Sequence, residues 1–235
     1  MSETRVETLY ARVKDMAVSF KLRPGERINE VSLARELNAS RTPLREALNR
    51  LVTEQLLSFQ AGKGFFCRAL DAQSVFDLYE LRASLEVLSV QLACERASDE
   101  GIAELKENEF VDGMLYAGRT IGEAGAGDEA FHVSIARLSG NSELVTQLER
   151  INERTRFIRW VAMAEAVVRT KGEHQVIMNA LEARDAVKAA EVMRGHVMRR
   201  MDQIVAAVRE GFSNIYVSGP EEIFERKLAG EELTQ

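Results

Sequence analysis

The sequence predicts a mostly α-helical protein in two parts, an N-terminal winged helix-turn-helix domain and a C-terminal all-α helical bundle. The chain of 235 residues contains only 3 prolines and is 46% hydrophobic, which favours helices and provides enough apolar material for one large domain or two modest ones. Apolar residues recur at helical spacing along most of the chain. A strand-turn-strand pattern, LLSFQ-AGKG-FFCR, falls within the first 70 residues.

Residues 1–70 show the element order of a winged helix-turn-helix. Helical spacing covers residues 6–20, a Pro24-Gly25 turn follows, and a short helical pattern covers residues 31–37. The segment SRTPLREALNRL then begins a third helix, since Ser and Thr favour N-caps and Pro suits a first helical turn. The LLSFQ and FFCR segments complete the domain as a β-hairpin.

Residues 71–210 are expected to form the helical bundle. A long helix begins after Asp71, and its apolar stripe is expected to line the core; the stripe consists of Leu78, Leu81, Leu85, Leu88 and Leu92. Breaks are predicted near 139–141, 171–172 and 184–185, which gives roughly six helices. Residues 211–235 are less regular and form either a docked arm or a frayed tail.

Charge is distributed unevenly along the chain. Residues 1–70 contain 12 Lys and Arg against 8 Asp and Glu, and the chain totals of 31 and 37 leave 19 and 29 for the remainder. A basic N-terminal segment followed by an acidic remainder suggests that only residues 1–70 bind a polyanion. The alternative is that the charges are scattered without a functional reason. The sequence shows no secretory signal, no membrane-length apolar segment and no CxxC motif, so a cytoplasmic protein is expected.

The third predicted helix carries the candidate DNA contacts. In a helix-turn-helix, the start of the second helix of the motif reaches base edges in the major groove. Arg41 and Arg45 could pair with guanine there, and Thr42 could bind a phosphate or a base. Gly62 and Lys63 in the hairpin turn suit a minor-groove or phosphate contact. The alternative for the two arginines is a solvated helix face with ion pairs to nearby acids.

Residues 22–51, LRPGERINEVSLARELNASRTPLREALNRL, resemble the DNA-binding signature of the GntR family of bacterial transcription regulators. The matching landmarks include Pro24-Gly25, Ser40-Arg41-Thr42-Pro43 and Arg45-Glu46-Ala47-Leu48. The resemblance implies operator contacts by Arg41, Thr42 and Arg45, with Gly62 and Lys63 contributing from the wing. Some relatives carry an additional arginine near Val31, where this chain is apolar.

All 3 histidines lie in the predicted bundle. Asp128 and His132 are four residues apart and so share one side of a helix, while His174 and His196 fall on later helical segments. One carboxylate and three imidazoles would suit a borderline divalent ion such as Zn²⁺, Ni²⁺ or Mn²⁺. By spacing alone, a surface Asp-His hydrogen bond and unliganded helical histidines are the alternative.

Residues 72 to about 210 resemble the FCD ligand-binding domain, which accompanies this type of winged helix in the FadR-type branch of the GntR family. The similar segments are YELRASLE, DEAFHVSIARLSGN, EHQVIMNALEARD and AAEVMRGH. The resemblance places the metal ligands of the family on Asp128, His132, His174 and His196. It also implies that the ion, with Zn²⁺ expected first, holds the carboxylate of a small organic acid.

Three further residues are candidate effector contacts. Arg82 borders the leucine stripe and matches an arginine of the family that would pair with the effector carboxylate, whereas an ion pair with Glu86 is the alternative. Arg154 borders a later apolar stripe and is a weaker candidate. Asn141 could touch the ligand or cap the following helix. Glu173, beside His174, is expected to be a surface acid.

The expected function is a ligand-responsive transcription regulator, a repressor by the habit of the family, that binds double-stranded operator DNA as a homodimer. A carboxylate metabolite bound at the metal and Arg82 would control operator affinity. Two alternatives remain open from the sequence, a metalloenzyme that acts on a small organic acid and a constitutive DNA-binding dimer with a structural metal. No HExxH motif or comparable acid-base pair favours the enzyme.

Overall fold

The computed structural model describes residues 5–110, 120–201, 204–213 and 215–216, and these residues form two compact units. The first unit comprises the described residues up to Asp71 together with those that follow Gly211, and the second runs from Ala72 to Gly211. The predicted arm or tail at 211–235 falls mostly outside the described residues. Within the first unit, the Tyr216 hydroxyl lies 3.4 Å from the carbonyl oxygen of Pro24.

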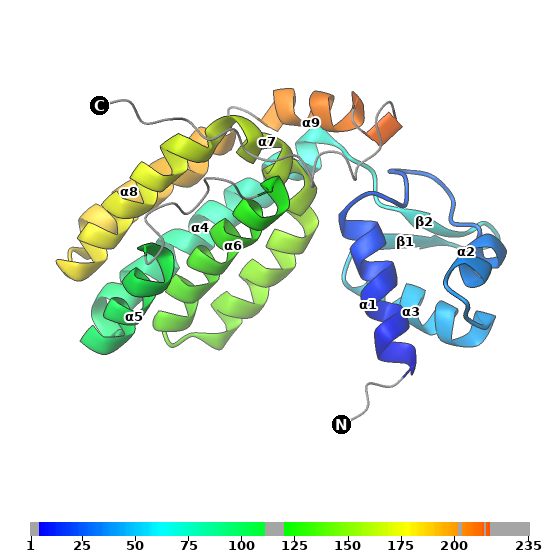
Figure 1. Ribbon diagram of the computed structural model, residues 1–235, viewed down its shortest axis with the longest axis horizontal. Coiled ribbons are helices and arrows are strands. Elements are labelled where there is room, and N and C mark those ends of the chain that lie inside the picture. The colour runs from blue at the N-terminus through cyan, green and yellow to red at the C-terminus, as the bar shows by residue number, and fades with distance from the viewer. Residues whose placement is uncertain (1–4, 111–119, 202–203, 214, 217–235) are drawn as a thin grey trace. The chain divides into compact units, whose positions relative to one another are not determined.

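The first unit has three helices followed by a two-stranded antiparallel sheet (Figure 1). Asn29 caps the second helix, because its side-chain oxygen accepts hydrogen bonds from the amides of Val31 and Ser32. Apolar side chains of all three helices and the sheet share one core, which includes Val13, Leu33, Leu48 and Phe65. The elements are α1 (Arg5–Val18), α2 (Glu30–Glu36), α3 (Arg41–Thr53), β1 (Leu57–Gln60) and β2 (Gly64–Cys67).

The sheet of this unit is a short hairpin of the predicted kind. Its register pairs Leu57 with Cys67 and Gln60 with Gly64. Gly62 in the connecting turn has a φ of 75°, a left-handed conformation that glycine adopts without steric cost. The hairpin follows the third helix as the wing of a winged helix-turn-helix does, which confirms the predicted fold class for this part of the chain.

The second unit is all-α among its described residues (Figure 1). Helix α4 packs against α6, α7 and α8, so it occupies the middle of the bundle. The helices are α4 (Ala72–Arg96), α5 (Asp99–Phe110), α6 (Ile121–Leu138), α7 (Ser142–Glu182), α8 (Ala186–Met201) and α9 (Ile204–Ser213). None of the described helices is long and apolar enough to cross a membrane.

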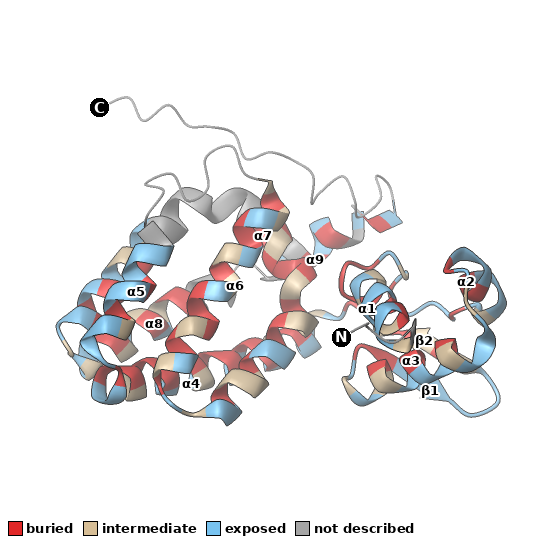
Figure 2. Cartoon of the chain, turned by 60° about the horizontal axis from the view of Figure 1, so that its bottom comes forward, coloured by how far each residue is buried: buried red, intermediate tan, exposed pale blue. Residues whose placement is uncertain are grey.

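Two details of the bundle differ from the sequence prediction. Helix α7 continues through Lys171 and Gly172, where a break was predicted, because one glycine weakens a helix by only about 1 kcal/mol. The leucine stripe of α4 does not all face the core: Leu78 is buried, but Leu81 and Leu88 are 51% and 42% exposed. Figure 2 shows exposed and buried residues alternating along α4.

Candidate metal centre and nucleic-acid interface

The first turn and a half of α3 present the predicted DNA-binding side chains to solvent. Arg41, Thr42 and Arg45 are all exposed, while the opposite face of the helix is buried. Ser40 holds the extended backbone of an N-cap, although its side chain makes no capping hydrogen bond. The start of α3 therefore presents backbone amides and two exposed guanidinium groups to solvent, and this combination suits an anionic partner. The buried face consists of Leu44, Ala47, Leu48 and Leu51.

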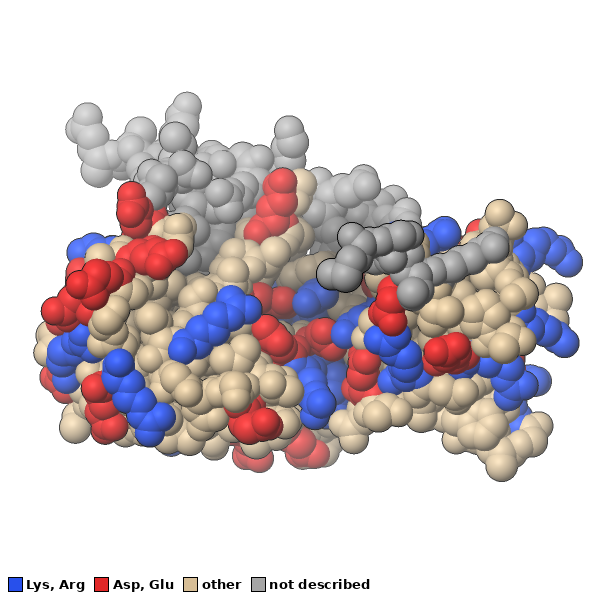
Figure 3. Space-filling view, turned by 90° about the horizontal axis from the view of Figure 1, so that it is seen from below, with Lys and Arg blue, Asp and Glu red and all other residues tan. Residues whose placement is uncertain are grey.

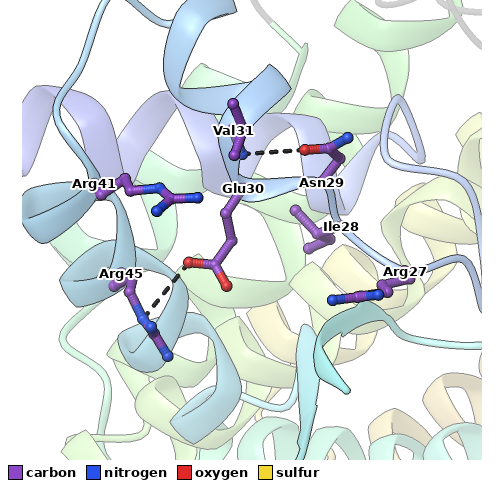
Figure 4. A pocket seen from close by; sticks show the side chains of 7 residues that line it. All are labelled: Arg27, Ile28, Asn29, Glu30, Val31, Arg41 and Arg45. Atoms are coloured by element: carbon purple, nitrogen blue, oxygen red, sulfur yellow. Dashed lines mark hydrogen bonds and ion pairs between the residues drawn. The ribbon is translucent and has the colours of Figure 1, made fainter. Parts of the chain in front are cut away.

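A hollow in front of α3 gathers three arginines around one acid (Figure 4). Arg27, Arg41 and Arg45 line it together with Glu30, whose Oε2 lies 3.5 Å from Arg45 Nε. An exposed pair of this kind contributes little to stability, so Arg45 can exchange Glu30 for a phosphate or a base. No carboxylate of a described residue lies within ion-pair distance of Arg41.

The wing adds a second exposed cationic point. Gly62 and Lys63 both lie at the exposed tip of the hairpin, where the Lys63 amide donates a hydrogen bond of 3.0 Å to the Gln60 carbonyl. Val31, at the position where some relatives carry arginine, is 49% exposed in α2. Figure 3 shows Lys and Arg side chains along one edge of the first unit. Cationic groups from a recognition helix and a wing are what a winged helix-turn-helix offers to DNA.

The four predicted metal ligands converge in the second unit. Asp128 and His132 lie on α6, His174 on α7 and His196 on α8, and all four side chains are buried. One potential ligand atom from each lies within 4.8 Å of the others. His132 Nε2 is 3.1 Å from His196 Nε2, and Asp128 Oδ1 is 3.4 Å from His174 Nε2. Tetrahedral zinc with Zn–N bonds of about 2.0–2.1 Å separates its ligand atoms by ~3.3 Å.

Carboxylates behind two of the imidazoles fix how these rings are protonated. Glu86 lies against His132 Nδ1, and Glu173 Oε2 lies 2.7 Å from His196 Nδ1. An imidazole that donates from Nδ1 to a carboxylate keeps a lone pair on Nε2. Two lone pairs 3.1 Å apart repel each other unless a proton or a cation lies between them. This donor set therefore fits a divalent ion.

Glu86 joins the histidine cluster to Arg82. Both residues are buried on α4, and Arg82 Nε donates a hydrogen bond of 2.6 Å to Glu86 Oε1. Burial raises the pKa of Glu86, but the charges of Arg82 and His132 outweigh this effect and lower it to about 2. Burial lowers the pKa of His132 to about 4, even though Glu86 opposes the change. At neutral pH the pair is therefore a carboxylate beside a neutral imidazole, the protonation state that metal binding requires.

Arg159 on α7 holds the carboxylate of Asp128. Its Nη2 donates to Asp128 Oδ2, and its Nη1 donates to Asn152 Oδ1 at 2.7 Å. Burial lowers the pKa of Arg159, but the carboxylates of Asp128 and Glu129 raise it by more. The guanidinium therefore stays charged beside the Asp128 carboxylate, whose Oδ1 lies 3.4 Å from His174 Nε2 in the cluster.

The three candidate effector contacts predicted from the sequence lie in different surroundings in the structure. Arg82 lies in the bundle interior, and its ion pair with Glu86 is buried and not the surface pair that was the alternative from the sequence. Among the described residues, no hydrogen-bond acceptor reaches Arg82 Nη1 or Nη2. Asn141 caps α7 by accepting from the amides of Glu143 and Leu144, which is the capping role that the sequence left open. Arg154 is half-buried, and burial lowers its pKa.

Three residues that contact the cluster of Asp128 and the histidines were missed or misjudged from the sequence. Glu173 was expected to be a surface acid, but its side chain is only 14% exposed and contacts His196. Glu86 was considered only as a partner of Arg82. Arg159 was overlooked, although polar Asn152, Thr155 and Arg159 follow one another at helical spacing among apolar residues of α7. That polar row inside an amphipathic pattern was the available signal.

Comparison with known protein families accounts for most of the chain. The family model described as bacterial regulatory proteins, gntR family, matches residues 5–67. The model of the FCD domain matches residues 77–199. The two matches fall on the three helices with the hairpin and on the helical bundle, respectively.

Individual relatives and solved structures agree with these matches. The Nta operon transcriptional regulator of Aminobacter aminovorans is 45% identical over 206 residues, which cover 86% of this chain and 95% of that protein. The transcriptional repressor GlaR of Escherichia coli is 29% identical over 80% of this chain and 90% of its own. The structure of E. coli McbR/YncC has a TM-score of 0.64 at 22% identity, and covers 90% of this chain and 100% of its own. A GntR-type regulator from Rhodococcus sp. RHA1 has a TM-score of 0.66 at 21% identity, over 87% and 99%. These structures share the fold.

Proposed function

The chain belongs to the GntR family of bacterial transcriptional regulators and carries an FCD domain, and we propose that a small carboxylate metabolite controls its affinity for operator DNA. It is a transcriptional regulator and not an enzyme, as its family and named relatives are. The metabolite would bind in the helical bundle beside a divalent ion. Regulation of this kind acts on chromosomal DNA, so the proposal includes a cytoplasmic location.

On the DNA side, we assign base and phosphate contacts to Arg41, Thr42 and Arg45, and backbone contacts to Gly62 and Lys63. Exposure of all five residues at the start of α3 and at the wing tip supports this assignment. A homodimer would present two such units to a two-fold symmetric operator. The names of two relatives, the repressor GlaR and a probable D-xylose utilization operon repressor, favour repression.

The metal proposal depends on one observation above all, the opposed Nε2 atoms of His132 and His196 with a carboxylate behind each ring. We assign Asp128, His132, His174 and His196 as ligands. Three imidazoles and a carboxylate favour Zn²⁺, with Ni²⁺ and Mn²⁺ as alternatives. When bound, such an ion would act as a Lewis acid that attracts a carboxylate oxygen.

Arg82 is the side chain best suited to bind the effector carboxylate opposite the metal ion. Its Nε is engaged with Glu86, whereas Nη1 and Nη2 are buried without an acceptor among the described residues. Buried guanidinium donors are costly to leave unsatisfied, and a carboxylate satisfies two of them at once. Arg154 and Asn141 rank behind Arg82 because one is half-buried and the other caps α7.

Helix α4 offers a covalent route from the effector to the DNA-binding unit. It carries Arg82 and begins at Ala72, five residues after β2 ends at Cys67. An effector changes operator affinity only if it binds one arrangement of the protein better than another. A shift of α4 on effector binding would supply that difference.

The test measures metal content and thermal unfolding of the full chain against a panel of small organic acids, before and after chelation. About one equivalent of a divalent ion is expected, and one acid class should raise the unfolding midpoint only in the metal-loaded protein. An acid at about 100 times its dissociation constant adds ~2.7 kcal/mol of stability. Bound metal without any acid response would favour the structural-metal alternative, and no bound metal would contradict the proposed centre.

A further inference from the structure

Val31 is an apolar side chain in a cationic part of the surface. Among the described residues of α1, α2 and α3, it is the only large apolar side chain that is exposed. It is the second residue of α2 and lines the same hollow as Arg27, Arg41 and Arg45. A single exposed valine needs no explanation on an ordinary surface, but this valine lies beside three guanidinium groups.

The arginines that line the hollow are only partly neutralised. Among the described residues, Arg45 is the only one of the three within ion-pair distance of a carboxylate, that of Glu30. Three guanidinium groups against one carboxylate leave an excess of two positive charges. Figure 4 shows Val31 and Arg41 on one side of the hollow and Arg27 on the other. Because this excess attracts the phosphates that border a DNA groove, DNA bound to α3 should also cover the hollow.

An uncharged side chain in this position can recognise only one feature of a base edge. Arg41 is the first residue of α3, the helix that enters the major groove in a helix-turn-helix, and Val31 lines the same hollow. In the major groove, the bases present hydrogen-bond donors, acceptors and the 5-methyl group of thymine. A valine side chain neither donates nor accepts a hydrogen bond. Of these features, it therefore favours the methyl group alone.

We propose that Val31 is a specificity-determining residue that contacts the 5-methyl group of a thymine in the major groove, next to the base that Arg41 binds. The neighbouring arginines select bases by hydrogen bonds, whereas Val31 selects by apolar contact. This inference rests on the proposed function in one respect, since it requires the start of α3 to lie in the major groove. It extends the proposed function to α2, which carries none of the DNA contacts assigned above.

The first experiment removes the methyl group from the DNA. The full-length wild type selects a duplex from a random pool, and each thymine of that duplex is replaced in turn by deoxyuridine, which lacks only the 5-methyl group. At one thymine of a half-site, the replacement should weaken wild-type binding about fourfold, the contribution of one buried methyl group. Val31→Ala should bind the thymine duplex about fourfold more weakly and should not distinguish it from the deoxyuridine duplex. Fluorescence anisotropy at a fixed salt concentration gives the affinities.

Val187→Ala is the matched control. It removes the same atoms from a valine of α8 that is 80% exposed, and it should keep the full dependence on the thymine methyl group. A thymine dependence that persists in Val31→Ala would overturn the proposal. The same conclusion would follow if every deoxyuridine duplex bound the wild type as tightly as the thymine duplex does.

The second experiment uses the wild type alone, so it does not depend on the folding of any variant. Cytosine and 5-methylcytosine are placed in turn at the thymine identified above. The two bases differ only in the methyl group, so the 5-methylcytosine duplex should bind about fourfold more tightly. Equal binding of the two duplexes would contradict the proposed contact.

Arg41→Ala separates this inference from the proposed function. If Arg41→Ala binds the selected duplex as the wild type does, while Val31→Ala cancels the thymine dependence, the contacts proposed for α3 are wrong and the Val31 contact stands. If Arg41→Ala weakens binding but no thymine depends on Val31, the contacts proposed for α3 stand and the Val31 contact is wrong.

Discussion

The Nε2 atoms of His132 and His196 lie 3.1 Å apart. On the other side of each ring, the Nδ1 atom contacts a carboxylate, Glu86 for His132 and Glu173 for His196. Both carboxylates come from outside the four predicted ligands, one from α4 and one from α7. Outer carboxylates of this kind orient imidazole ligands and make them more basic. The affinity of the centre for its ion should therefore depend on Glu173 as well as on the ligands.

Substitution of Glu173 by glutamine should weaken metal binding by about 10-fold or more, because the amide cannot match the hydrogen bond of a carboxylate to His196 Nδ1. Competition with a chromophoric chelator measures the affinity. Glu191→Gln is the control, since Glu191 is an exposed acid of α8 that pairs with Lys188. Equal metal affinity in the two variants would show that Glu173 does not act through His196.

Arg82→Lys should reduce effector affinity by about 10-fold or more while metal content and operator binding persist. Lysine keeps a positive charge beside the buried Glu86 but lacks the planar pair of donors that holds a carboxylate. Arg82→Ala is a poorer test, because an uncompensated buried carboxylate costs about 3–5 kcal/mol. Isothermal titration with the acid identified by thermal shift gives the affinity. Unchanged effector binding in Arg82→Lys would remove Arg82 from the effector site.

The metal-free protein should lose stability as the pH falls from about 6.5 toward 2. The native pKa of His132 is about 4, below its ordinary value of 6.5, so the unfolded chain binds a proton in this window that the native protein does not. Glu86, with a native pKa of about 2 against an ordinary 4.5, extends the loss to lower pH. The stabilisation is thus complete above pH 6.5. Thermal unfolding at pH 7, 5.5 and 4 measures it, and a constant midpoint across this range would contradict the prediction.

Arg41→Ala and Lys63→Ala should weaken operator binding in different ways. Loss of a guanidinium that pairs with a base costs about 1–3 kcal/mol and relaxes sequence preference at one position of each half-site. Loss of Lys63 should weaken binding evenly across sequences and lower the salt slope by about 1 for each contact removed. Fluorescence anisotropy at several salt concentrations distinguishes the two effects. Lys188→Ala, an exposed cation of α8, is the control and should bind as the wild type does.

Local patterns were sufficient to predict the winged helix-turn-helix and the helical class of the bundle. Short elements with strong turn chemistry, such as Pro24-Gly25 and the AGKG turn, leave few alternatives. The ligand quartet could be proposed because Asp128 and His132 share a helix face and the chain has only 3 histidines. Family resemblance, rather than spacing, connected them to His174 and His196.

The orientation of α4 could not be predicted from its sequence. Leucine spacing alone indicated that the stripe faces the core, but the buried side of α4 carries Arg82 and Glu86. Arg82 forms an ion pair with Glu86, and Glu86 also contacts His132. These contacts lower the cost of burying the two charges. Which face of a helix is buried depends on side-chain partners from distant segments of the chain. Local periodicity carries no information about these partners. Glu173 was misjudged for the same reason, since His196 lies 23 residues away.

Two glycines of α6 provide a matched pair for testing how closely α6 and α7 pack. A Cβ atom at Gly125 would collide with the indole of Trp160, the single tryptophan of the chain, whereas a Cβ at Gly127 would meet nothing within 4 Å. Gly125→Ala should therefore destabilise the protein by about 1–3 kcal/mol, as overpacking does. Gly127→Ala should stabilise it by about 0.5–1 kcal/mol, because alanine loses less backbone entropy in a helix. Urea unfolding gives both values.

Tryptophan fluorescence then shows whether the cause is the proposed one. Trp160 adjoins Arg159, which holds Asp128, so displacement of the indole by Gly125→Ala should change the emission spectrum and also weaken metal binding. Gly127→Ala should leave the emission unchanged, although it is next to Asp128 in the sequence. If both variants show the same stability and the same emission, the contact between Gly125 and Trp160 does not determine the spacing of the two helices. If Gly125→Ala changes emission alone, the position of α7 at Trp160 is independent of the metal centre.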